Sequence, residues 1–181
     1  MRTIMLIAVV VVGTGMLAAG AMLTGAEEGT QAAEANPQID YDGFVKQVQE
    51  VAKVREQRRV SEDEFIRMLN DPDTIVLDAR SKRMYDLLHV KGAVHLSLPD
   101  MTEDELAELI PAKDTRVVIY CNNNFKNEPL AFATKAKVAS LNLNTYNTLY
   151  SYGYRNIYEL KPLLDRHQTK IPFAGTSVEA D

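Results

Sequence analysis

The chain has 181 residues, of which 46% are hydrophobic and 25% are charged. These proportions are those of a folded globular protein and exclude an intrinsically disordered chain. The formal net charge is -5, and the acidic residues are spread along the sequence. Because no basic surface is available for the phosphate contacts on which nucleic-acid binding depends, nucleic acid is excluded as a partner.

The N-terminal segment has the pattern of an export signal. Met1 and Arg2 are followed by an almost uncharged apolar run that ends in small residues before Glu27. Residues 1–26 are therefore predicted to be a signal peptide, which places the protein in the periplasm or another extracytoplasmic compartment. The run is also long enough to cross a bilayer, so an uncleaved N-terminal anchor is the alternative and would be the only membrane contact.

Two further segments precede the main domain. Residues 27–40 are small and polar without periodicity, which predicts a flexible spacer. Phe44, Val48 and Val51 then recur at helical spacing, which predicts an amphipathic helical extension over residues 41–59. This helix either packs against the main domain or binds a partner.

The main domain, residues 60–165, alternates predicted helices and strands, and residues 166–181 are expected to be a C-terminal tail. Capping boxes that begin at Ser61 and Thr102 predict a helix after each. Strands are predicted over residues 74–77, 93–98, 116–120 and 156–160, and further helices over residues 128–141 and 145–152. Helices between mostly parallel strands indicate an α/β domain.

Cys121, the only cysteine, directly follows the strongest predicted strand. Ligands of such folds bind beyond the carboxyl ends of the strands. The loop after Cys121 is rich in Asn, which tolerates left-handed backbone, so its backbone amides could form an anion-binding nest. The positive charge of Lys126 and the N-terminus of a helix from Glu128 would favour the thiolate of Cys121 over the thiol. The alternative is an inert buried cysteine. An exported chain with one cysteine has no internal disulfide partner, which favours a free reactive thiol or an intermolecular bridge.

Four stretches between about Val60 and Leu164 resemble motifs of the rhodanese-like domains, and they occur in the family's order. They are Ile75-Val76-Leu77-Asp78-Ala79-Arg80, Tyr85 with His89-Val90-Lys91-Gly92-Ala93, Val118-Ile119-Tyr120-Cys121, and Tyr152-Gly153-Tyr154-Arg155-Asn156-Ile157-Tyr158. The resemblance implies a rhodanese-like three-layer α/β domain with a mostly parallel central sheet flanked by helices.

The resemblance also implies a sulfurtransferase in which Cys121 is the nucleophile. Cys121 would take a sulfane sulfur from a thiosulfate-like donor, hold it as a persulfide and pass it to cyanide or a thiol, which could belong to a protein. The implied substrate-binding residues are Asn122, Asn123, Asn124, Phe125 and Lys126 of the loop, with Arg80 at the rim of the cleft. An ion pair with Asp78 is the alternative role of Arg80. No cofactor or metal is implied, and His89 and His95 are expected to be structural.

Departures from the family pattern leave other functions open. Related phosphatases need Cys-x5-Arg, whereas Asn127 is the sixth residue after Cys121, and this spacing fits sulfur. Asn124 stands where the loop of the family has Gly, and an extra segment before Gly153 is expected to form an added helix or to cover the site. The alternative function is a catalytically idle rhodanese-like module that binds a partner protein or senses oxidants through Cys121. A structural element of an envelope complex, built on the N-terminal helix, is a third hypothesis.

Overall fold

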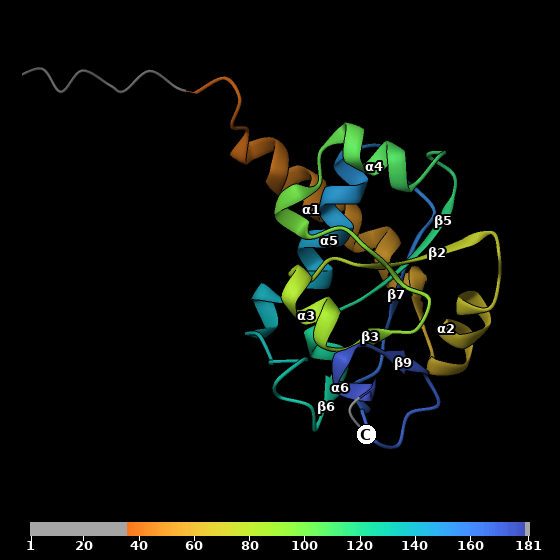
Figure 1. Cartoon of the computed structure of the whole chain (residues 1–181). Helices are drawn as coiled ribbons and strands as arrows, with labels where there is room; N and C mark the ends of the chain where they lie inside the picture. Colours follow the sequence, from red (N-terminus) through yellow and green to blue (C-terminus); the bar gives the residue numbers. More distant parts are fainter. Residues whose placement is uncertain (1–35, 180–181) are drawn as a thin grey trace, which may run out of the picture. The chain divides into compact units, whose positions relative to one another are not determined.

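A computed structural model describes residues 36–179 of the chain (Figure 1). The predicted signal peptide or anchor, and most of the predicted spacer, lie outside the described residues. From Gln38 onward the chain forms one compact unit. Within the described part, no helix has both the length and the apolar character that crossing a membrane requires.

The central element of the described residues is a five-stranded sheet with the strand order β1-β7-β5-β2-β4. All four strand pairs are parallel, as expected for an α/β domain. The strands are β1 (Arg59–Val60), β2 (Thr74–Asp78), β4 (Val94–His95), β5 (Arg116–Tyr120) and β7 (Ile157–Leu160). Two small sheets are also present: β3 (His89–Val90) pairs with β9 (Phe173–Ala174), and β6 (Phe125–Lys126) pairs with β8 (Leu164–Asp165).

Helices cover both faces of the central sheet and give it three layers (Figure 1). The α-helices are α1 (Tyr41–Arg55), α2 (Glu62–Leu69), α3 (Lys82–Leu87), α4 (Glu103–Leu109), α5 (Leu141–Ser151) and α6 (Thr176–Glu179). Short 3-10 helices are η1 (Glu56–Arg58), η2 (Leu98–Asp100), η3 (Asn122–Asn124) and η4 (Lys137–Ala139).

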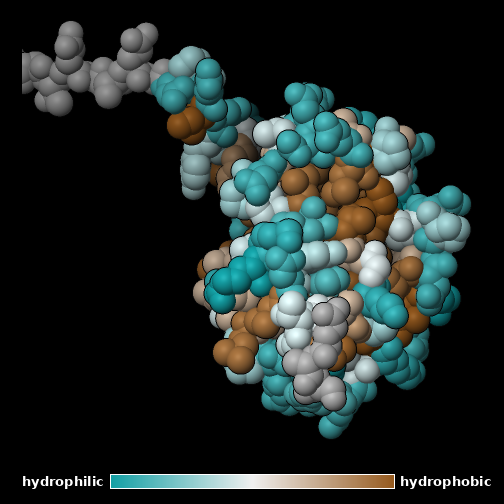
Figure 2. All heavy atoms as spheres, viewed as in Figure 1, coloured by the Kyte–Doolittle hydropathy of each residue, from teal (hydrophilic) through white to brown (hydrophobic). Residues whose placement is uncertain are grey.

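Each face of the sheet has its own hydrophobic core. On β5, Val118 and Tyr120 point to the core shared with α2, whereas Val117 and Ile119 point to the core shared with α4 and α5. This alternation follows from the two-residue period of a strand, and both faces are apolar because both are covered. Hydrophilic residues cover most of the molecular face shown in Figure 2, with apolar residues grouped in patches between them.

The elements with strong local signals lie where the sequence predicts them. The Ser61 hydroxyl accepts a hydrogen bond from the Glu64 amide at 3.2 Å, and the Thr102 hydroxyl accepts one from the Glu105 amide at 3.3 Å, so both predicted caps are present. The strand predicted over residues 116–120 is β5. The strand predicted over residues 93–98 is shorter, because only Val94–His95 pair before the chain turns into η2.

The prediction of a helix over residues 128–141 is wrong, because residues 128–140 contain only η4. Its buried residues, Ala131 and Phe132, are adjacent in sequence, while Leu130 and Val138 are exposed. Residues 133–139 are all exposed, so the stretch has no stripe of buried residues at helical spacing. The second predicted helix exists as α5 but begins at Leu141, four residues before the predicted start.

Both ends of the described chain pack on the domain. In α1, Val51 is buried and the Gln47 side chain donates a hydrogen bond to the carbonyl of Asn147 in α5 at 2.9 Å. Residues 166–179, expected to be a tail, include β9 and α6, and the Phe173 ring lies 5.1 Å from that of Phe125.

Candidate active site around Cys121

Cys121 lies at the carboxyl end of β5, where two polar groups lie close to its side chain. It is the N-cap residue of η3, in which the Asn124 N–H donates to the Cys121 carbonyl at 3.1 Å and faces the sulfur in a capping-box arrangement. The Ser140 hydroxyl, at the start of α5, lies 3.5 Å from the same sulfur. Cys121 is 1% exposed and lines the cavity described below.

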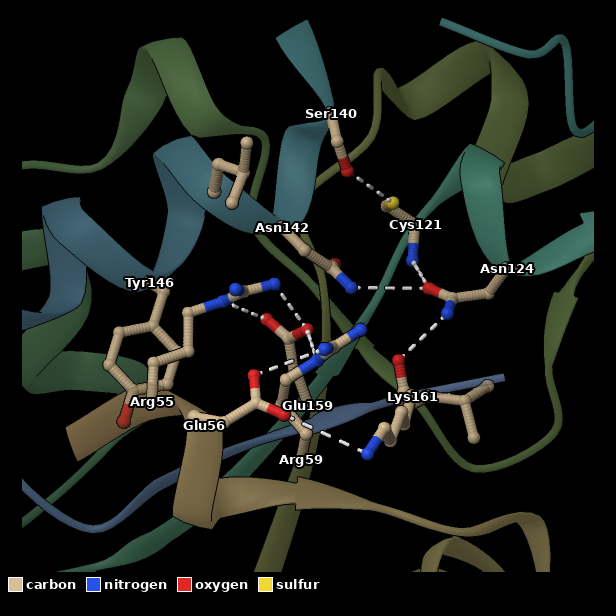
Figure 3. A network of polar contacts seen from close by, with 12 residues as sticks. Arg55, Glu56, Arg59, Cys121, Asn124, Ser140, Asn142, Tyr146, Glu159 and Lys161 are labelled. Atoms are coloured by element: carbon tan, nitrogen blue, oxygen red, sulfur yellow. Dashed lines mark hydrogen bonds and ion pairs between the residues drawn. The ribbon is translucent and has the colours of Figure 1, made fainter. Parts of the chain in front are cut away.

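Asn124 fixes the backbone around Cys121. Its Oδ1 accepts hydrogen bonds from the Cys121 N–H at 2.9 Å and from the Asn142 amide at 3.1 Å, and its Nδ2 donates to the Leu160 carbonyl at 2.8 Å. This side chain therefore joins the ends of β5 and β7 to the start of α5 (Figure 3). The left-handed conformation expected of the loop asparagines is wrong for Asn122–Asn124, which form η3; among the described non-glycine residues, only Asn127 has a positive φ, of 67°.

The loop after Cys121 does not form the predicted anion-binding nest. Phe125 is buried, with its ring centroid 4.7 Å from that of Phe132 and 6.1 Å from that of Tyr120. Phe125 and Lys126 form β6, which pairs with β8, and the Lys126 side chain is exposed. Neither residue lines the cavity at Cys121. Burial of the Phe125 ring pulls the chain into the core, so the structure does not bring Phe125 or Lys126 into the cavity that Cys121 lines.

Arg80 is a buried structural cation. Its Nε and Nη2 donate to the two oxygens of Asp78 at 2.9 and 2.6 Å, and its Nη1 donates to the Ala131 carbonyl at 2.9 Å. Burial opposes the charge of Arg80, but the hydrogen bonds and attraction of Asp78 raise its pKa above the ordinary value. The alternative prediction of an ion pair with Asp78 is thus confirmed. Arg80 does not line the cavity at Cys121, and its three guanidinium nitrogens all donate to the protein.

Tyr120 completes this buried network beside the site. Its hydroxyl donates to Asp78 and accepts a hydrogen bond from the Val90 N–H at 3.0 Å. Burial, with a contribution from the Asp78 carboxylate, raises the pKa of Tyr120 well above its ordinary value. The phenol therefore remains protonated and connects β5 to β2 and β3.

A cavity of about 270 Å³ opens beside the Cys121 side chain. Among the described residues, its cationic lining comes from four elements or their ends: Arg55 ends α1, Arg59 begins β1, Lys161 follows β7 and Lys137 begins η4. Asn123, Asn124, Ser140, Asn142, Leu143, Glu159 and Leu160 complete the lining. Most of this arrangement is visible in Figure 3.

Part of the positive charge of this cavity is neutralised internally. Glu159, 2% exposed, accepts hydrogen bonds from Arg55 Nε and Nη2 at 2.7 and 2.5 Å and from Arg59 Nε at 3.1 Å. Glu56 lies 3.2 Å from Arg59 and 3.7 Å from Lys161. Lys137 forms no ion pair within residues 36–179. The network thus has two more positive than negative charges and attracts anions.

A second cavity, of about 440 Å³, is lined by Asn122. It is formed by the ends of β2, β4 and β5 and is lined by residues that include Arg80, Ser97 and Lys135, but not Cys121. In the described part of the chain, no group of three or more His, Cys, Asp and Glu side chains is placed to hold a metal ion.

The sequence comparison assigns the chain to a family. The profile of the rhodanese-like domain matches residues 61–161. Because this match covers more than half of the chain, the protein belongs to the rhodanese-like domain family, as the sequence motifs predicted.

The chain is also similar to part of two curated enzymes. The tRNA uridine(34) hydroxylase of Streptococcus thermophilus is 37% identical over 75 residues, which cover 38% of this chain and 22% of that protein. The enzyme of the same name from Bacillus velezensis is 35% identical over 71 residues, or 36% of this chain and 21% of that protein. The chain thus spans about a fifth of the length of these relatives.

Two solved structures confirm the fold. The rhodanese-like domain of an Anabaena protein has a TM-score of 0.51 and 18% identity, covering 68% of this chain and 83% of that one. A Bacillus halodurans protein has a TM-score of 0.51 and 15% identity, covering 78% of this chain and 92% of that one. At these identities, the similarity shows the fold alone.

The sequence analysis missed the cations that line the Cys121 cavity and the serine beside the thiol. A signal existed for Arg55 and Arg59, which lie at the end of the helical extension predicted over residues 41–59. No local signal marks Ser140, which lies 19 residues after Cys121.

Proposed function

We propose that the protein is a sulfurtransferase that moves sulfane sulfur through a persulfide on Cys121. The observation that carries this proposal is the position of the Cys121 sulfur, at the carboxyl end of β5 and on the wall of a positively charged cavity. The Asn124 N–H and the Ser140 hydroxyl both lie where they would donate to a thiolate or a persulfide anion. The thiolate is the nucleophilic form of cysteine, and donors and cations of this kind favour it.

The reaction consists of two displacements at sulfur. The Cys121 thiolate attacks the sulfane sulfur of thiosulfate, a new S–S bond forms, and the old S–S bond breaks as sulfite leaves with its electron pair. A thiolate or cyanide then attacks the outer sulfur of the persulfide and regenerates the Cys121 thiolate. Atoms and electrons balance with the donor, Cys121 and the acceptor alone.

The test is the intact mass of the protein after incubation with thiosulfate. We expect a gain of one sulfur atom that is lost when cyanide or a thiol is added, and no gain in the Cys121→Ser variant. The experiment is repeated with other sulfane donors, because thiosulfate need not be the donor that the protein uses. If no donor adds sulfur to the folded protein, Cys121 is not a sulfur carrier.

A redox-sensing or partner-binding module is the second candidate function. Two observations favour it: Cys121 is buried, and the following loop forms η3 and β6 instead of an anion-binding nest. Such a protein would form a sulfenic acid on Cys121 with peroxide, trapped with dimedone, while remaining unreactive with sulfane donors. Sulfur loading and release over several cycles would contradict this alternative.

We also propose, from the apolar leader of the sequence, that the protein acts outside the cytoplasm. A small sulfur donor and a thiol-type acceptor, which could be a protein thiol, would then be its partners there. Cell fractionation with an antibody against the chain tests this location, and recovery in the cytoplasmic fraction would contradict it.

A further inference from the structure

A segment without buried side chains runs past Cys121 between β6 and α5. Residues 133–139 are all exposed and belong to neither hydrophobic core. The chain is fixed on both sides of them: Phe132 is 1% exposed, with the Arg80 guanidinium 4.3 Å from the centroid of its ring, and Leu141 begins α5. Residues 133–139, called the strap below, therefore span the surface between two anchored ends.

The strap forms part of the wall between the two cavities at this end of the sheet. Lys135 and Ala139 line the larger cavity, whereas Lys137 lines the smaller one beside Cys121. Ser140, the residue after the strap, also lines the smaller cavity and lies 3.5 Å from the Cys121 sulfur (Figure 3). Displacement of the strap would therefore join the two cavities and uncover Cys121.

Asn123 fastens the middle of the strap to the loop after Cys121. Its Oδ1 accepts a hydrogen bond from the Lys135 N–H at 2.8 Å, and its Nδ2 donates to the Lys135 carbonyl at 2.9 Å. This pair of hydrogen bonds, called the latch below, lies only two residues from Cys121 in the sequence. Both bonds are exposed to solvent. Because water competes for exposed hydrogen bonds, opening of the latch costs little free energy.

We propose, on the basis of the sulfurtransferase function above, that Asn123 determines the size of the molecules that react at Cys121, because it holds the strap closed. With the strap closed, Cys121 is 1% exposed and lines a cavity of about 270 Å³. This space suits a donor or acceptor of a few heavy atoms, such as thiosulfate, cyanide or a small thiol. The cysteine of a folded partner protein reaches Cys121 only after the latch opens.

The test compares two neutral thiol reagents of different size, N-ethylmaleimide and N-(1-pyrenyl)maleimide. Their rates of addition to Cys121 are measured by intact mass under native conditions, and the ratio of the pyrenyl rate to the ethyl rate reports access for large molecules. We expect a lower ratio for the unmodified chain than for free cysteine. Asn123→Ala should raise the ratio by about fivefold to tenfold, because it removes both hydrogen bonds of the latch. Asn123→Asp keeps only the acceptor and should raise the ratio less.

Lys135→Ala is the matched control, because both hydrogen bonds of the latch use the backbone of Lys135. This variant shortens an exposed side chain of the strap but keeps the latch, so the ratio should stay at the value of the unmodified chain. If Lys135→Ala raises the ratio as much as Asn123→Ala does, the side chains of the strap limit access to Cys121. The role proposed for Asn123 is then overturned.

Repetition at urea concentrations below the unfolding transition separates opening of the strap from global unfolding. Local opening leaves the pyrenyl rate nearly independent of urea, whereas global unfolding makes it rise steeply. A steep rise in Asn123→Ala, an unchanged ratio in that variant, or no reaction of N-ethylmaleimide with the folded chain would each overturn the proposal. So would a ratio for the unmodified chain equal to that of free cysteine. Maleimide addition involves no sulfane sulfur, so these outcomes do not depend on whether Cys121 forms a persulfide.

Discussion

Replacing Arg55 by methionine would remove one of the two guanidinium groups that neutralise Glu159. The carboxylate is 2% exposed and receives two hydrogen bonds from Arg55, at 2.7 and 2.5 Å, and one from Arg59 at 3.1 Å. Methionine keeps the apolar stem of the side chain but no charge. The variant therefore leaves a buried carboxylate with one cation instead of two.

The expected cost follows from this geometry. Removing one partner of a buried ion pair typically costs about 3–5 kcal/mol. Here Arg59 remains in contact, and the Arg55 side chain is itself 21% exposed, so water can replace part of the lost interaction. We expect Arg55→Met to lower the free energy of unfolding by about 2 kcal/mol, which lowers Tm by roughly 4–8 °C in a domain of this size.

Urea unfolding followed by circular dichroism measures this loss. Arg116→Met is the control, because Arg116 and Asp71 form a more exposed ion pair that should be worth less than about 1 kcal/mol. The double variant Arg55→Met/Glu159→Leu should recover at least part of the loss, since it removes the buried carboxylate as well. If Arg55→Met lowers the free energy of unfolding no more than Arg116→Met does, the Glu159 carboxylate does not need Arg55 to neutralise its charge.

Three further predictions test the site and the core. Lys126→Gln should change the rate of sulfur loading less than about twofold, because Lys126 lies on β6 and does not line the Cys121 cavity. A large decrease in this rate, measured by intact mass, would show that Lys126 takes part in the reaction. Asn124→Ala should lower the free energy of unfolding in urea by about 2–4 kcal/mol, because it leaves the Cys121 N–H and the Leu160 carbonyl unpaired. It should also speed alkylation of Cys121, and an unchanged alkylation rate would show that Asn124 does not position the thiol. Burial raises the pKa of Tyr146 from its ordinary value of 10.0 to about 12, so the folded state holds this proton more tightly than the unfolded state, and stability should fall as pH rises from 10 to 12. In thermal melts, the Tyr146→Phe variant should lose less stability between pH 10 and 12 than the unmodified chain. Equal losses in the two proteins would show that Tyr146 is not the cause.

Local chemistry made much of the fold predictable. The helices after Ser61 and Thr102 begin with side-chain caps that involve residues only three positions apart. The strand before Cys121 is a run of β-branched and aromatic residues that suits burial on both faces. Each of these signals lies within one element, so the sequence alone was sufficient to find it.

The surroundings of Cys121 depend on contacts that no local pattern contains. Arg55 meets Glu159 across 104 positions of the chain, and Ser140 reaches Cys121 across 19. The loop was misread because the Phe125 ring gains more from burial against Phe132 and Phe173 than from exposure at a site. The sequence thus located the thiol but not the groups that surround it.

The pairing of Glu159 with Arg55 and Arg59 has a consequence for protein engineering. Glu159 lies within the segment that defines the family, but the cations that it contacts come from before that segment. An isolated family segment grafted into another scaffold would lose both cations that neutralise this carboxylate. A transplantable version of this domain must therefore begin at α1, or must replace Glu159 by an apolar residue.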